Sequence, residues 1–132
     1  MSVTQLTVVP IGESLLNDTA IGNSVDGIKA TSAILNNVTI DNTANGPTGS
    51  NPGGTGAYLK LYNTQSGNVI VGTTEPDEVI YGPAGAEISV DYWTATEVGK
   101  SFPTALSMSC ETMGATGATG PSFPVIVTVA YQ

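Results

Sequence analysis

The chain has 132 residues and a net charge of −8, with 11% charged and 40% hydrophobic residues. Its three cations, Lys29, Lys60 and Lys100, are too few to neutralise nucleic-acid phosphates or to bind an anionic membrane surface. The chain has no His and a single Cys, which excludes Ser–His and Cys–His catalytic pairs, Cys/His zinc sites and an internal disulfide.

The first forty residues predict short strands. Extended structure is expected at 5–10 (QLTVVP) and at 24–30 (SVDGIKA), where Gly27 interrupts the second segment. The best short helical candidate, 12–20 (GESLLNDTA), is at most two turns long. Residues 32–42 (SAILNNVTIDN) alternate as a strand does, and the two adjacent Asn in the middle predict a bend or bulge.

A turn-rich loop follows at residues 43–56 (TANGPTGSNPGGTG), which holds five Gly and two Pro. Such a composition favours turns and supplies no apolar side chain for a core. We expect this segment to be the most flexible part of the chain. Neither flank is long enough for a core of its own, so we interpret it as an internal loop and not as a linker between domains.

Strand patterns recur after this loop. Residues 57–63 (AYLKLYN) alternate cleanly, and the short run EVIY lies between Pro76 and Pro83, which cannot donate to a ladder and so predict an edge strand. Cys110 lies between apolar residues and is expected to be a small buried hydrophobe. Further strands are predicted at 69–74 (VIVGTT), 86–93 (AEISVDYW), 104–113 (TALSMSCETM) and 124–132 (PVIVTVAYQ).

Short strands at roughly even spacing, separated by Gly, Pro and Asn turns, are typical of an antiparallel sandwich or barrel. The chain also holds 18 Thr, 11 Ser and 9 Asn, which favour strands and turns. We therefore predict an all-β fold, an antiparallel β-sandwich of jelly-roll or Ig-like type with long Gly/Pro-rich loops. Residues 1–23 are expected to form an N-terminal arm or edge strand, and 24–132 a single sandwich domain with loops 43–56 and 114–123.

The segment GATGATGP (114–121) places Gly at every third position, as a collagen triple helix does. Three triplets with Pro121 as the single Pro are too few for a stable triple helix. The segment also joins two predicted strands. We interpret it as a long hairpin loop of small residues that extends to a neighbouring subunit or to an exposed tip.

Acidic residues are the remaining candidates for chemistry. Glu75, Asp77 and Glu78 cluster in EPDE, and Asp18 and Asp26 flank a turn-rich region. Two facing carboxylates can hydrolyse a glycoside, and EPDE suggests a weak Ca²⁺ site, but neither reading has the supporting aromatic residues or an EF-hand pattern. We expect EPDE to be a solvated turn. The sequence thus predicts no catalytic residue, no cofactor and no metal ligand, and a protein that is not an enzyme.

No apolar run approaches the roughly 20 residues of a membrane span. The N-terminal residues MSVTQLTVVP lack the basic and long apolar regions of a signal peptide. These features predict a protein that is made in the cytoplasm and not exported by the usual route.

The order of motifs within residues 24–113 resembles that of a known family. A strand AYLKLYN, a turn VGTTEP, a PAG segment and an entry GKSFPTAL follow one another at 57–63, 71–76, 83–85 and 99–106. This pattern is similar to small all-β proteins encoded among the structural genes of tailed bacteriophages. The upstream IKATSAILNNVTIDNTAN also resembles the paired strands that open such domains.

The resemblance implies a virion protein, assembled in the cytoplasm of a host bacterium. We expect a capsid decoration or cement protein that stabilises the head by binding between major capsid subunits. Such proteins are commonly homotrimers, so the expected partners are the chain itself and the major capsid protein, with no nucleic acid and no membrane. The alternative is a head- or tail-fibre module that binds a host glycan through exposed Tyr, Trp, Asn or Asp.

Contacts with neighbouring subunits are expected in the apolar ends and in the small-residue loops, at 1–12, 43–56 and 114–124. Trp93 ends a strand and is expected to cap the core, with a subunit or ligand contact as the alternative. The candidate interface residues are Leu6, Val8, Val9, Ile11, Trp93, Phe123, Val125 and Val127.

Overall fold

The computed structural model describes residues 13–94, 98–114 and 117–132. This part of the chain folds into strands with one short 3-10 helix, η1 (Ser66–Asn68), so the prediction of an all-β protein is confirmed. The strands are β1 (Ser14–Ile21), β2 (Asp26–Lys29), β3 (Ala33–Asp41), β4 (Ala57–Tyr62), β5 (Glu78–Gly82), β6 (Glu87–Asp91), β7 (Lys100–Phe102), β8 (Leu106–Glu111) and β9 (Val125–Tyr131).

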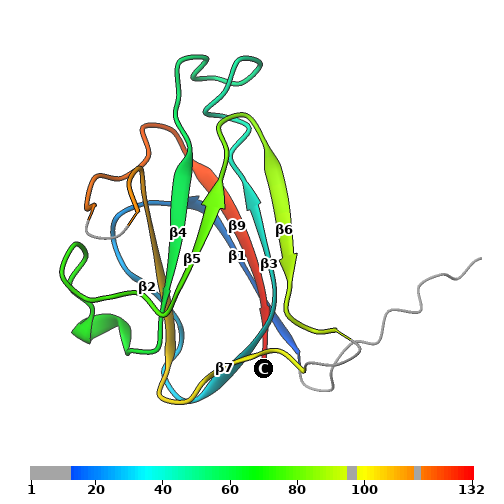
Figure 1. Ribbon diagram of the computed structural model, residues 1–132, viewed down its shortest axis with the longest axis vertical. Coiled ribbons are helices and arrows are strands. Elements are labelled where there is room, and N and C mark those ends of the chain that lie inside the picture. The colour runs from blue at the N-terminus through cyan, green and yellow to red at the C-terminus, as the bar shows by residue number, and fades with distance from the viewer. Residues whose placement is uncertain (1–12, 95–97, 115–116) are drawn as a thin grey trace, which may run out of the picture.

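The strands form two antiparallel sheets that pack face to face (Figure 1). Sheet A has the order β1-β9-β3-β6, with the short β7 also paired to β3, and sheet B has the order β2-β8-β4-β5. Apart from β7, the strands pair in a nested order from the two ends of the chain inward. The pairs are β1 with β9, β2 with β8, β3 with β6 and β4 with β5. This nested pairing is that of a jelly roll, and it decides between the two sandwich types that the sequence left open.

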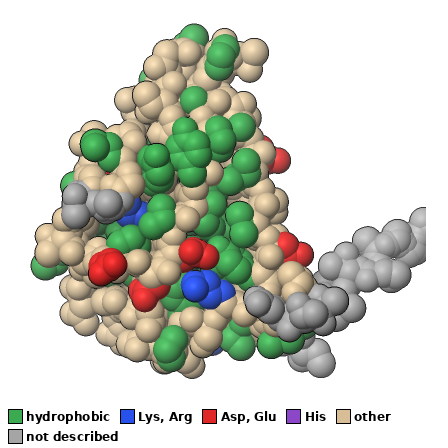
Figure 2. Space-filling model, in the orientation of Figure 1, with side chains coloured by type: hydrophobic (Ala, Val, Ile, Leu, Met, Phe, Trp, Pro, Cys, Tyr) green, Lys and Arg blue, Asp and Glu red, His purple; other side chains and the backbone are tan. Residues whose placement is uncertain are grey.

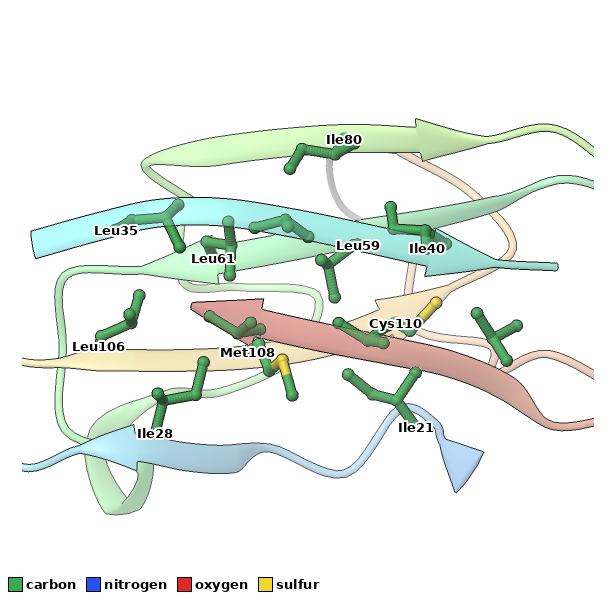
Figure 3. Packing of buried hydrophobic residues seen from close by; sticks show 14 of the residues in the cluster. Ile21, Ile28, Leu35, Ile40, Leu59, Leu61, Ile80, Leu106, Met108 and Cys110 are labelled. Carbon is green, nitrogen blue, oxygen red and sulfur yellow. The ribbon is translucent and has the colours of Figure 1, made fainter. Parts of the chain in front are cut away.

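The core lies between the sheets and follows from the period-2 alternation of the strands. Leu59 and Leu61 on β4 face Leu35 and Ile40 on β3, and the sulfur-containing Met108 and Cys110 come from β8 (Figure 3). Cys110 is a buried free thiol, as predicted, and its burial raises its pKa to about 12. Seventeen buried apolar side chains make up this cluster, and each of the two sheets contributes to it.

Several local predictions are confirmed. The register of β3 against β9 shifts between Leu35 and Asn37, which places the predicted bulge at the Asn pair. The register of β2 shifts beside Gly27, where the sequence predicted an interruption. The run after Pro76 forms β5, which is one of the two edge strands of sheet B.

Two segments differ from the prediction. The helical candidate 12–20 lies largely in strand β1, because pairing with β9 along the whole sheet outweighs a weak local helical pattern. Residues 69–74, predicted as a strand, form a turn instead, because Gly72 adopts a left-handed φ of 87°. The turn is closed by Thr73 and Thr74, whose backbone N–H groups both donate to Ile70 O.

Of the two forms expected for residues 1–23, an N-terminal arm or an edge strand, the structure has the edge strand at residues 14–21. Strand β1 is an edge strand of sheet A, and Ile21 belongs to the core. Residues 14–21 are thus part of the sandwich, and a domain boundary after residue 23 does not exist in the structure. The expected strand at 5–10 lies outside the described residues.

Loop 43–56 is connected to the sandwich by buried amide side chains, which the sequence did not indicate. Asn42 is fully buried, and its Nδ2 donates to Thr55 O and Gly82 O at 3.1 Å each. Asn45 Nδ2 donates to Asn42 Oδ1 at 2.9 Å, and Asn51 Nδ2 donates to Asn45 Oδ1 at 3.1 Å. This chain of amide side chains takes the place of an apolar core for the loop, and the flexibility of the loop stays a prediction.

Candidate functional site

The outer face of sheet B carries polar side chains that are buried, which is unusual for a face turned away from the core. Loop 112–124, which contains the GATGATGP segment, lies over this face. Gly114 packs against the ring of Tyr58, and Gly117 O accepts a hydrogen bond from Lys60 Nζ at 2.9 Å. Gly114 and Gly117 therefore lie against β4 of their own domain. The buried polar side chains of this face are Lys60, Tyr62, Ser107, Ser109 and Glu111.

An ion pair lies at the centre of this covered face. Lys60 Nζ and Glu111 Oε1 are 3.2 Å apart, and the two side chains are 1% and 0% exposed. Ser109 Oγ donates to Glu111 Oε1 at 3.2 Å and lies 3.0 Å from the hydroxyl of Tyr62. Among the described residues nothing hydrogen-bonds Glu111 Oε2. Burial raises the pKa of Glu111, while the hydrogen bonds from Ser109 and Lys60 oppose this effect. The pair ties β4, β8 and the loop together.

A hollow of about 660 Å³ opens beside the covered pair. Its floor comes from Tyr58 on β4 and Val79 on β5, and its walls from residues 73–76 and Gly114. The ring of Tyr58 lies 4.9 Å from that of Tyr81, with the two planes tilted by 44°. Figure 2 shows hydrophobic side chains gathered over β4 and β5 on this face of the molecule. The hollow thus combines an apolar floor with a wall that carries hydroxyl and carboxylate groups.

The predicted acidic cluster is divided among three environments. Asp77 Oδ2 accepts from the backbone N–H of Asn63 at 2.7 Å, and Glu78 Oε2 accepts from the hydroxyl of Tyr92 at 2.7 Å. Glu75 is exposed at the wall of the hollow. Burial raises the pKa of Tyr92 above its ordinary range, and the hydrogen bond to Glu78 adds a smaller effect in the same direction. Within residues 13–94, 98–114 and 117–132, no three His, Cys, Asp or Glu side chains gather as metal ligands would.

The second acidic pair does come together. Asp18 and Asp26 line a smaller hollow of about 360 Å³ between β1 and β2. The hydrogen bond with Asp18 raises the pKa of Asp26 to about 6, and burial and the repulsion between the two carboxylates act in the same direction. Asp26 therefore keeps its proton to a higher pH than an ordinary aspartate does.

Replacing Asp26 by Asn is expected to stabilise the protein at neutral pH. Because the pKa in the folded state is about 6 and the ordinary value is 3.8, the folded state favours the protonated acid. The stability that this proton confers is fully present below pH 3.8 and is lost as the pH rises through about 6. Asn mimics the protonated form of Asp26. The gain in stability should therefore be present above about pH 6 and absent below pH 3.8.

The expected gain is under about 1 kcal/mol, because Asp26 is partly exposed and solvent screens the interaction. Urea unfolding at a series of pH values measures it. Glu87→Gln, at an exposed residue of β6, serves as the control and should show no such dependence. A pH-independent effect of Asp26→Asn would contradict the raised pKa of Asp26.

The structure places the predicted interface residues in different environments. Val125 and Val127 are 0% exposed and belong to the core of their own domain, so they are withdrawn as subunit contacts. Phe123 is 40% exposed. Trp93 is half-buried and forms an isolated bridge with Val98. The remaining four residues, Leu6, Val8, Val9 and Ile11, lie outside the described residues.

Two of the predicted contact loops meet at one end of the sandwich. Asn45 Nδ2 in loop 43–56 donates to Phe123 O in loop 112–124 at 3.0 Å. The loops thus form one continuous surface at this end. The sequence could not indicate this proximity, because the two segments are far apart along the chain.

The outer face of sheet A is the other regular surface. Four short polar side chains lie in one row across its strands: Asn17 on β1, Thr128 on β9, Thr39 on β3 and Ser89 on β6. Thr128 Oγ1 donates to Asn17 Oδ1, and Thr39 Oγ1 donates to Ser89 Oγ, at 3.3 Å each.

Two apolar side chains flank the row on the same face. Leu15, which pairs with Ala130, is 71% exposed, and Ile126, which pairs with Asp41, is 38% exposed. Acidic side chains lie toward the β6 side, where Asp41 pairs with Glu87. The face therefore combines uncharged polar groups and two apolar anchors with acidic side chains toward β6.

Comparison with known proteins finds neither a family model nor a curated protein that matches this chain. None of the helical structure in the described ranges is long and apolar enough to cross a bilayer.

Proposed function

We propose that this chain is a structural protein of a tailed-bacteriophage virion, a decoration or cement protein that binds between major capsid subunits, as a homotrimer. The jelly roll is an architecture used by viral capsid and lectin domains, which supports a structural or binding role. The resemblance of residues 24–113 to small phage structural proteins supports the same role.

The observation that carries the proposal is the outer face of sheet A. Short side chains such as Asn17, Thr39 and Ser89 lose little conformational entropy when a partner covers them, and each can donate and accept hydrogen bonds. Leu15 and Ile126 add exposed apolar surface to the same face. Apolar anchors within a polar surround are the usual anatomy of a protein interface. Binding of this face to the shell would stabilise the folded chain by mass action.

The proposal is tested by adding the purified chain to capsids that lack it. We expect binding in hundreds of copies per particle, at sites between capsid subunits in electron micrographs, and capsids that resist heat better. Asn17→Lys combined with Ser89→Lys places long charged side chains at two exposed positions of the row and should weaken binding at least about tenfold.

A matched variant, Thr31→Lys with Thr104→Lys, adds the same charge at exposed positions outside sheet A and should bind as the original chain does. Equal binding by both double variants would exclude sheet A as the docking face. A few copies per particle, together with binding of the isolated chain to host cells, would instead indicate a fibre module.

A further inference from the structure

We propose that the hollow beside the covered ion pair is a binding site for a neutral saccharide. The hollow has a volume of about 660 Å³, which is within the range of small-molecule sites in proteins. It lies on sheet B, on the opposite side of the sandwich from the proposed docking face, so a shell-bound protein would leave it open. The inference does not depend on docking to a capsid.

The floor of the hollow offers an apolar surface that is held in place. Tyr58 contributes a ring that packs against Tyr81, with ring centroids 4.9 Å apart, and that borders Gly114, which also lines the hollow. Val79, which is 41% exposed, and Pro76 extend this surface. The C–H groups of a pyranose ring pack well on such a surface, because an aromatic face is apolar and carries a negative quadrupole. Little conformational entropy is lost, since the ring is already fixed.

The wall of the hollow supplies polar groups at its edge. Thr73 is exposed, and Thr74 Oγ1 accepts a hydrogen bond from the backbone N–H of Ile70 at 2.9 Å, which leaves its own proton free to be donated. The carboxylate of Glu75 is exposed beside them and can accept from sugar hydroxyls. Both Thr backbone N–H groups donate to Ile70 O, so the wall is a defined turn.

Charge decides which polar ligand fits. No cationic side chain is among the described residues that line the hollow, and the nearby Lys60 is buried against Glu111. With a net charge of −8, the protein repels phosphates, nucleic acids and acidic sugars. A cationic ligand would find one exposed carboxylate, that of Glu75, which solvent screens. A neutral polyhydroxyl compound matches the apolar floor and the hydroxyl-rich wall together.

The test uses the full chain labelled with ¹⁵N and a panel of methyl glycosides of glucose, galactose, mannose and N-acetylglucosamine, with cellobiose and chitobiose. We expect at least one compound to shift the amide signals of Tyr58, Thr73, Val79 and Gly114 with a dissociation constant of about 1–10 mM. Thr73→Ala should weaken this binding about 3- to 10-fold, through loss of a hydrogen bond. Thr104→Ala, at an exposed Thr outside the hollow, is the matched control.

Glu75→Gln separates a saccharide from a cationic ligand, because the amide can still accept hydrogen bonds but has no charge. Saccharide binding should survive this change within about threefold. The inference is overturned if no compound of the panel shifts these signals, or if only an arginine-rich peptide does and Glu75→Gln abolishes its binding. It is equally overturned if the signals shift with protein concentration alone, which would mean that a second copy of the chain fills the hollow.

Discussion

Replacing Lys60 by Met is expected to lower the free energy of unfolding by about 3–5 kcal/mol, because the variant leaves Glu111 charged and buried without its counter-ion. Lys60 also donates to Gly117 O, so the covering loop loses its attachment to β4 in the same variant. Urea unfolding followed by circular dichroism measures the loss. Lys29→Met, at a partly exposed lysine, is the matched control and should change stability by no more than about 0.5 kcal/mol.

Two further measurements show whether the charge of Glu111 causes the loss. Replacing both partners, Lys60→Met with Glu111→Leu, should recover most of the stability, since apolar pairs often replace buried ion pairs without cost. The pKa of Glu111 is already raised by burial, and removing Lys60 raises it further. A raised pKa means that the stability is present at low pH and lost as the pH rises, so the single variant should approach the original chain in acid. A double variant as unstable as the single one would contradict this account.

The sequence predicted the strands well where alternation was complete. Residues 57–63 and 104–113 alternate without interruption, and they form the central strands β4 and β8. The segment 69–74 has three consecutive β-branched residues, but Gly72 and the side chain of Thr74 close a turn there. In this segment the turn-forming residues therefore outweigh the β-propensity of the β-branched residues. Whether a turn forms depends on how the flanking strands are placed.

Strand order could not be predicted, because pairing of the first strand with the last depends on contacts across almost the whole chain. The same limit applies to the candidate sites. Alternation places Lys60 on the polar face of one strand and Glu111 on that of another, but their contact depends on the register of β4 against β8. The hollow draws on residues 58, 73–76, 79 and 114, which only the folded chain brings together.

Loop 43–56 shows how polar residues can take the place of a core. Its predicted flexibility rested on Gly and Pro content, yet Asn42 and Asn45 are buried within it. Asn42 connects the loop to β5 through Gly82 O, and its backbone O accepts from the N–H groups of Asn45 and Gly85. An amide side chain can satisfy several backbone groups at once, which a count of apolar residues does not reveal.

Replacing Asn42 by Ala is accordingly expected to lower the free energy of unfolding by about 2–3 kcal/mol, because Thr55 O and Gly82 O lose their donor. Asn45 Nδ2 also loses its acceptor, Asn42 Oδ1. Urea unfolding measures the global loss. Amide exchange at Asn51 and Gly54, whose N–H groups donate within the loop, should accelerate beyond what the global loss accounts for.

Asn68→Ala, at an exposed Asn of η1, is the matched control and should leave both measurements nearly unchanged. If Asn42→Ala destabilised the protein without faster exchange in the loop, the amide chain would not be what orders it. If neither measurement changed, water would replace the side chain at no cost, and the order of the loop would come from its turns alone. We expect both a global loss of stability and faster local opening of loop 43–56. Both effects would show that the surface formed by this loop and loop 112–124 depends on the buried amide of Asn42.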